Sequence, residues 1–156
     1  MKYKKSVLRR EFLLLRKKKY LKTKKFNFNL IFKLIKKHFN KKKIIIAGYY
    51  PSNYEVNILD FLKEASKKKF SIALPVIKKN GKMSFKFWFK NETLSVNKFG
   101  ILEPASSKKD VTPDLIIVPL ISFDKYLNRI GYGKGYYDRY LKKISKIKKN
   151  MISLGM

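Results

Sequence analysis

Short apolar runs that suit buried β-strands alternate along this 156-residue chain with stretches of helical periodicity. The runs that predict strands are "KIIIAGYYP", "FSIALPV", "PDLIIVPLISF" and, at the start of a last strand, "MISLGM". A further stretch, "GKMSFKFW", follows an Asn-Gly turn and alternates apolar with polar residues, which predicts a more exposed strand. The helical patterns cover residues 4–19, 26–39, 52–66 and about 136–147, and residues 98–106 are expected to form a loop.

This alternation predicts an α/β fold of three layers, in which helices cover both faces of a mostly parallel, Rossmann-like sheet. Residues 1–156 are expected to form one domain, because the length is close to the common domain size and no repeat or long linker divides it. Ligands bind such sheets at the carboxyl ends of the strands. Residues 49–54 and 120–134 each follow a strand, so we expect both segments at that edge.

The charge of the chain is strongly positive, with 39 Lys and Arg against 10 Asp and Glu and a formal net charge of +29. Such a field attracts anions, and nucleic acid is the obvious candidate. The lysines are nevertheless spread over the whole chain, as in a protein with a compositional bias towards Lys, Ile, Asn, Phe and Tyr. Arginine, which grips phosphate through two N–H groups, occurs only at positions 9, 10, 16, 129 and 139. We therefore expect no specific nucleic-acid partner.

Several classes of site and location are excluded by composition. The absence of cysteine excludes disulfides and thiolate metal sites, and the single histidine, His38, excludes a histidine-rich metal site. The longest apolar run, residues 115–123, is too short for a membrane span and contains Pro119. The apolar piece "FLLL" near the N-terminus fits an amphipathic helix better than a signal peptide. We expect a cytoplasmic monomer that acts on a small molecule and has no membrane contact.

Three of the seven glycines stand at alternate positions in "RIGYGKGYYDRYL", residues 129–141, just before a predicted helix. Backbone N–H groups at a helix start favour a phosphate, and glycines let the backbone approach it closely. Lys134 has the charge to neutralise a phosphate chain, and Asp138 is placed to hold Mg²⁺. The loop thus predicts a nucleotide site. A flexible turn that caps a helix remains an alternative, because the spacing matches neither of the two best-known phosphate motifs.

The longer stretch "VPLISFDKYLNRIGYGKGYYDRYL", residues 118–141, closely resembles the signature of the 5-formyltetrahydrofolate cyclo-ligase family, also called methenyltetrahydrofolate synthetases. "KKSVLR" at 4–9, "YYPSNYEVNIL" at 49–59 and "FGILEP" at 99–104 resemble further stretches of the family, in the same order. The glycine signature is specific, and the other matches are weak singly. The resemblance implies a ligase that forms a C–N bond. It would use ATP and Mg²⁺ to phosphorylate the formyl oxygen of 5-formyltetrahydrofolate and close the ring to 5,10-methenyltetrahydrofolate, with release of ADP and phosphate.

The resemblance also implies roles for residues of this chain. Lys134 and Arg129 would act on the transferring phosphate, and Asp138 would bind Mg²⁺. The remaining ATP contacts would come from Lys5, Arg9, Gly131, Tyr132, Gly133, Gly135, Tyr136 and Tyr137. The folate contacts would come from Tyr50, Glu55, Tyr132, Lys134 and Tyr136.

Simpler roles stay open for some of these residues. Ser52 and Glu55 form the pattern S-x-x-E, which is typical of a capping box at a helix start and is compatible with a folate contact nearby. Asp138 in a first helical turn would complement the helix dipole without any metal. Lys5 has the alternative of an ordinary solvated lysine.

Members of the resembled family continue past the strand that "MISLGM" begins, with a segment that carries a second Mg²⁺-associated carboxylate. The chain is therefore expected to lack that segment, either as a fragment or as a naturally short form. Two other functions stay open. One is a basic nucleic-acid-binding or inactive relative on the same fold, and the other is a different phosphate-handling α/β enzyme.

Overall fold

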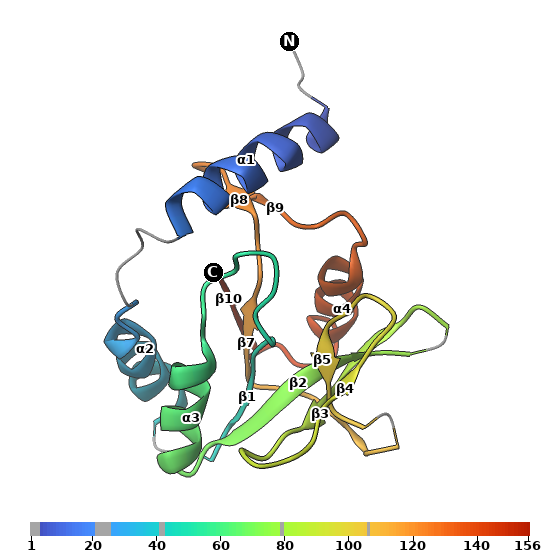
Figure 1. Cartoon of the computed structure of the whole chain (residues 1–156). Helices are drawn as coiled ribbons and strands as arrows, with labels where there is room; N and C mark the ends of the chain where they lie inside the picture. Colours follow the sequence, from blue (N-terminus) through green and yellow to red (C-terminus); the bar gives the residue numbers. More distant parts are fainter. Residues whose placement is uncertain (1–3, 21–25, 41–42, 79, 106) are drawn as a thin grey trace.

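A six-stranded sheet forms the centre of the computed structural model, which describes residues 4–20, 26–40, 43–78, 80–105 and 107–156 (Figure 1). The strand order is β10-β7-β1-β2-β3-β6. The strands β1, β2, β7 and β10 are parallel, and β3 and β6 add an antiparallel edge. Their bounds are β1 Ile45–Ala47, β2 Ser71–Ile77, β3 Met83–Phe87, β6 Asp110–Val111, β7 Leu115–Val118 and β10 Ile152–Gly155. The predicted mostly parallel sheet is confirmed, including its last strand.

Helices cover both faces of this sheet, which confirms the three layers. α2 (Asn29–Phe39) and α3 (Leu59–Lys67) pack on one face, and α4 (Tyr136–Ile144) packs on the other (Figure 1). Successive strand residues point to opposite faces. Accordingly Ile46 belongs to the core under α2 and α3, whereas Ala47 belongs to the core under α4. The continuous apolar runs of the sequence reflect this burial on both sides.

The first helix, α1 (Lys5–Tyr20), does not belong to either layer. It has no buried residue, and it lies across the end of the molecule at which β7 leads into the hairpin of β8 (Ser122–Phe123) and β9 (Arg129–Ile130) (Figure 1). This is the carboxyl end of the parallel strands, where α/β sheets bind ligands. None of the helices in the described part of the chain is both long and apolar enough to cross a membrane.

The expected loop at residues 98–106 includes one strand of a second small hairpin, β4 (Ser95–Val96) with β5 (Leu102–Glu103). The expectation of a more exposed strand at residues 81–88 is wrong, because four of the five residues of β3 are buried. The Lys86 side chain is 4% exposed, and its Nζ lies 3.0 Å from the Oδ1 of Asp110 on β6. Lys86, one of the alternating polar residues, is thus buried and paired with a half-exposed aspartate, and it does not lie on a solvent-facing side.

The helix expected over residues 52–66 begins only at Leu59, which is a second correction. Asn53 and Tyr54 have φ angles of 47° and 61°, in the left-handed region, so residues 52–55 form a turn. The hydrogen bond of a capping box is still present, because the Ser52 amide donates to the Glu55 carboxylate over 2.8 Å. The pattern was therefore recognised correctly, but the inference that a helix starts there was wrong.

Candidate active site

A cavity of about 390 Å³ opens at the carboxyl ends of β1, β2 and β7. Its walls include three segments that are far apart in the sequence: α1, the turn after β1, and the glycine loop with the start of α4. All thirteen residues that the sequence singles out line this cavity, namely Lys5, Arg9, Tyr50, Glu55, Arg129, Gly131, Tyr132, Gly133, Lys134, Gly135, Tyr136, Tyr137 and Asp138. The structure brings them together, while their individual roles remain predictions.

The glycine loop has a backbone that other residues adopt only with strain. Gly133 has a φ of +96° and Gly135, the N-cap of α4, has a φ of +67°. A Cβ on Gly133 would lie 3.4 Å from Cζ of Arg9, and one on Gly135 would lie 2.9 Å from Nη1 of Arg139. Glycine is therefore favoured here by the backbone conformation, and two guanidinium groups lie close to it.

Four of the five arginines of the chain bond to the glycine loop or its flanks: Arg9, Arg16, Arg129 and Arg139. The Nε of Arg9 donates to the Gly131 carbonyl over 2.8 Å, and Nη1 of Arg139 donates to the Lys134 carbonyl over 3.0 Å. These bonds hold the loop from both sides. They also place positive charge beside the N-terminus of α4, where the helix dipole already favours an anion.

Asp138 and Arg129 form an ion pair at the edge of the cavity, with 2.5 Å between Oδ1 and Nη2. The Asp138 side chain is 69% exposed, so its second oxygen is accessible. Among the described residues no group of three or more Asp, Glu, His or Cys side chains could hold a metal. A metal here would thus rely on Asp138 together with phosphate and water oxygens, an arrangement that suits Mg²⁺.

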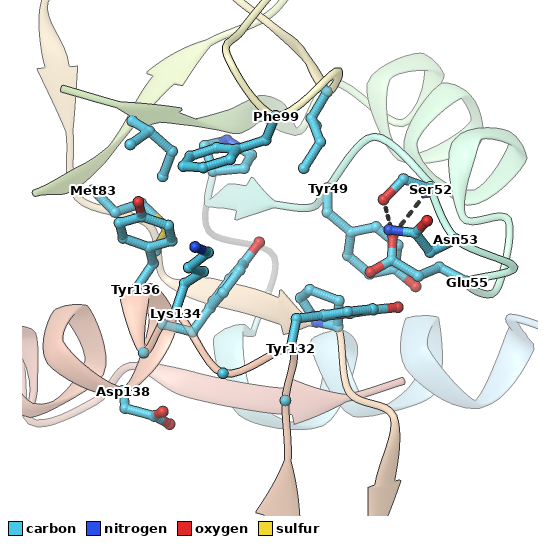
Figure 2. A pocket seen from close by; sticks show the side chains of 18 of the residues that line it. Tyr49, Ser52, Asn53, Glu55, Met83, Phe99, Tyr132, Lys134, Tyr136 and Asp138 are labelled. Atoms are coloured by element: carbon cyan, nitrogen blue, oxygen red, sulfur yellow. Dashed lines mark hydrogen bonds between the residues drawn. The ribbon is translucent and has the colours of Figure 1, made fainter. Parts of the chain in front are cut away.

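The opposite wall contains the buried carboxylate of Glu55 (Figure 2). One of its oxygens, Oε2, accepts hydrogen bonds from the amide and the hydroxyl of Ser52, over 2.8 and 3.3 Å. Burial raises the pKa of Glu55, whereas the hydrogen bonds from Ser52, the proximity of the Tyr132 hydroxyl and the charge of Arg16 lower it. A buried carboxylate of this kind is a selective acceptor for N–H donors of a ligand.

Aromatic rings form flat walls between these two ends. Phe99 and Tyr136 lie with their ring centroids 6.1 Å apart, and Nζ of Lys134 is 5.7 Å from the centre of the Phe99 ring (Figure 2). Tyr137 also lines the cavity, and its buried hydroxyl has no hydrogen-bond partner within the described structure.

The sequence did not reveal the wall that the β4–β5 hairpin contributes through Asn97, Phe99, Ile101 and Glu103. The Asn97 side chain accepts hydrogen bonds from the amides of Phe99 and Ile101, over 2.8 and 3.1 Å, and so shapes the hairpin. Glu103 accepts from the amide of Ile77 over 3.2 Å and attaches the hairpin to the end of β2. The Asn and Gly of "NKFGILEP" were the signal of a turn, but no local pattern shows where a turn will dock.

Comparison with known proteins is consistent over the whole chain. Residues 1–155 match the model of the 5-formyltetrahydrofolate cyclo-ligase family. The chain is 34% identical over 102 residues to the 5-formyltetrahydrofolate cyclo-ligase of Escherichia coli and 31% identical over 102 residues to that of Haemophilus influenzae. These matches cover 62% of this chain and 56% and 54% of the two relatives, so the chain spans about half their length.

Solved structures agree with this result. The 5,10-methenyltetrahydrofolate synthetase of Aquifex aeolicus matches with a TM-score of 0.68 and 28% identity, over 97% of this chain and 76% of that one. The enzyme of the same name from Mycoplasma pneumoniae matches with a TM-score of 0.62 over 90% of this chain and 79% of that one. At 24% identity, the second match supports the fold alone.

Proposed function

The chain belongs to the 5-formyltetrahydrofolate cyclo-ligase family, and we propose that it converts 5-formyltetrahydrofolate and ATP into 5,10-methenyltetrahydrofolate, ADP and phosphate, with Mg²⁺ bound beside the nucleotide. One observation carries the proposal: the residues implied by the family signature come from distant segments and line one cavity. That cavity has a cationic, glycine-rich end for phosphate and an acidic, aromatic end for a pterin.

The reaction explains why phosphate and folate must meet. A formamide carbon is a weak electrophile, and its oxygen has to leave before the ring can close. Transfer of the γ-phosphoryl group to that oxygen makes it a good leaving group. N10 then bonds to the formyl carbon and loses its proton, and the C–O bond breaks to release phosphate that contains the former formyl oxygen. The protein has to align the reacting atoms and stabilise the developing charge.

The phosphate end of the cavity suits this task. Lys5 and Lys134 supply point charges, and Arg9 and Arg129 can each direct two N–H groups at phosphate oxygens. The glycine loop leaves room for the anion at the start of α4. Asp138 would hold Mg²⁺, which would neutralise further charge on the phosphates.

The folate end is suited to a flat, polar ring. Glu55 can accept from the N–H groups of the pterin, and Tyr50, Tyr132 and Tyr136 can line its faces and edges. The glycine loop reaches from the folate end of the cavity to the phosphate end, because it contains both Tyr132 and, two residues later, Lys134. One short segment would thus contact both substrates, which favours their alignment.

The test is an assay of the purified chain with 5-formyltetrahydrofolate and Mg-ATP, in which methenyltetrahydrofolate is followed by its absorbance. We expect product only when ATP and Mg²⁺ are both present. Lys134→Met should abolish turnover, whereas Lys90→Met, at an exposed position outside the cavity, should leave it unchanged. ATP binding without any product from the unmodified chain would reject the proposal in favour of another phosphate-handling function.

A further inference from the structure

We propose that Arg16 is a positioning residue of the active site, which holds Tyr132 beside Glu55 and thereby sets the shape of the folate-binding wall. Arg16 does not line the cavity, and no signature residue of the sequence pointed to it. This inference rests on the proposed function, because it takes the bound molecule to be a folate. The hydrogen bonds of Arg16 are a property of the ligand-free protein and do not depend on that function.

The contacts of Arg16 join three parts of the chain. Its Nη1 donates to the Tyr132 hydroxyl over 3.1 Å, and its Nη2 donates to the carbonyls of Leu120 and Ile121, the latter over 3.0 Å. Leu120 and Ile121 follow β7, and Tyr132 lies in the glycine loop. A side chain on α1 therefore fixes both the connection after β7 and the loop that forms the cavity wall.

The hydrogen-bond polarity of this contact matters. The Tyr132 oxygen accepts from Arg16, so the hydroxyl hydrogen is directed elsewhere, and the Glu55 carboxylate is the negative charge that acts on this hydroxyl. Ser52 binds the same carboxylate from the other side. Glu55 is thus held between Ser52 and a tyrosine whose own orientation depends on Arg16.

Charge and shape both favour arginine at this position. Glu55 is 6% exposed, and the guanidinium of Arg16 is a cation that offsets the cost of burying its charge. Guanidinium offers five N–H donors in a fixed plane and can serve three acceptors at once, which an ammonium on a flexible stem does poorly. In a chain whose cations are mostly lysine, this use of an arginine is informative.

The first test compares Arg16→Met, Arg16→Lys and Arg10→Met by calorimetric titration with 5-formyltetrahydrofolate and, separately, with ATP. Arg10 is exposed on the same helix and serves as the matched control. We expect Arg16→Met to weaken folate binding by about tenfold or more, because a hydrogen bond to a charged group is lost. Arg16→Lys should recover part of this loss, and Arg10→Met should bind as the unmodified chain does. ATP affinity should fall less than folate affinity in Arg16→Met, because the Tyr132 hydroxyl that Arg16 holds lies on the Glu55 side of the cavity.

A second variant keeps the inference testable if Arg16→Met is less stable. Tyr132→Phe removes the acceptor of the Arg16 bond without touching the bonds to Leu120 and Ile121. If Arg16 acts through Tyr132, the double variant should bind folate about as weakly as the worse single variant. Equal loss of folate and ATP affinity, or strictly additive effects, would overturn the proposal.

A measurement on the ligand-free protein separates this inference from the proposed function. The pKa of Glu55, followed by carboxyl NMR, should rise further in Arg16→Met and stay unchanged in Arg10→Met, because the charge of Arg16 lowers it. If the unmodified chain bound no folate and this pKa still rose, the proposed function would fail and the electrostatic action of Arg16 on Glu55 would stand. An unchanged pKa would reject the positioning role whatever the ligand.

Discussion

Glu55 combines deep burial with a negative charge at the folate end of the cavity. Because burial raises its pKa, the carboxylate takes up a proton at a higher pH than an ordinary glutamate does. Protonation removes acceptor capacity for the N–H groups of a pterin. We therefore expect Glu55 to make folate binding depend on pH.

The first prediction follows from this coupling. Folate affinity should fall as the pH is lowered through the raised pKa of Glu55, and Glu55→Gln should have weaker affinity, by about tenfold, with little pH dependence. Titrations between pH 5 and 8 measure both properties. Unchanged affinity in Glu55→Gln, with only a loss of stability of about 0.5–2 kcal/mol, would leave Glu55 as a structural residue of the turn.

Asp138 gives a second prediction at the same scale. Its side chain is 69% exposed, so Asp138→Asn should cost at most about 1 kcal/mol of stability through the lost ion pair and dipole contact. Turnover should then require a much higher Mg²⁺ concentration, whereas ATP binding without Mg²⁺ should be unimpaired because Arg129 is released from the pair. The measurement is turnover as a function of Mg²⁺ concentration at fixed ATP. If Asp138→Asn needed no more Mg²⁺ than the unmodified chain, Asp138 would only stabilise the start of α4 through the helix dipole.

Some residues of the site can be identified from a sequence motif, whereas others are brought to the site only by the packing of distant elements. Lys134 and Asp138 stand inside a specific signature, so the sequence was sufficient to single them out. Arg16 and Phe99 reach the site from α1 and from the β4–β5 hairpin, and their distance in sequence from the loop hides that contact. The only hint in the sequence that Arg16 has a specific role was that arginine is rare in this lysine-rich chain.

The glycine loop is the element in which backbone conformation and charge depend most on each other. Gly133→Ala would introduce a Cβ at a positive φ, 3.4 Å from Cζ of Arg9. Gly81, with a φ of +74° and nothing within 4 Å of its virtual Cβ, provides a matched control outside the site. Alanine at either position strains the backbone, but only alanine at position 133 also changes the cavity wall. A comparison of the two variants therefore separates these effects.

The third prediction compares these two glycines. Gly133→Ala and Gly81→Ala should each lose about 1–2 kcal/mol of stability from the left-handed backbone. Only Gly133→Ala should also weaken ATP binding, because the strained residue lies in the loop that is proposed to hold the phosphates. Denaturant melts and ATP titrations of both variants make the comparison. A loss of ATP affinity in both variants would show that general loosening, and not the loop, is responsible.

Helices and strands were predicted well where the prediction used runs of buried apolar residues. They were predicted less well where it used the positions of polar residues. The apolar runs of β1, β2 and β7 have the continuous pattern of strands that are covered on both faces. Ser52 and Glu55 resemble a helix cap, but two left-handed residues between them turn the chain away before Leu59. In β3, Lys86 appears polar in sequence and is covered by Asp110 from a strand 24 residues further on, which periodicity cannot show.

At the scale of the whole molecule, the sheet topology explains the position of the site. Because β1, β2, β7 and β10 are parallel, their carboxyl ends share one edge, and the segments that follow β1 and β7 meet there. This meeting was predictable from the alternation of strands and helices alone. The placement of α1 across the same edge was not, since it depends on polar bonds from Arg9 and Arg16 and not on a buried apolar face.

The net charge of +29 gives the fourth prediction. Random-sequence DNA should bind at low salt and lose affinity by about a thousandfold or more between 50 and 200 mM salt, as counterion release requires. At physiological ionic strength it should not compete with ATP or folate for the cavity. DNA binding that persisted there and displaced ATP would favour the alternative of a nucleic-acid-binding relative on this fold.

We propose that one cavity brings the γ-phosphate of ATP to the formyl oxygen of 5-formyltetrahydrofolate. The most direct test uses 5-formyltetrahydrofolate with ¹⁸O in the formyl group, Mg-ATP and the purified chain, with mass analysis of the phosphate released. We expect one molecule of phosphate with a single ¹⁸O atom for each methenyltetrahydrofolate formed. Unlabelled phosphate, or the absence of methenyltetrahydrofolate, would contradict it.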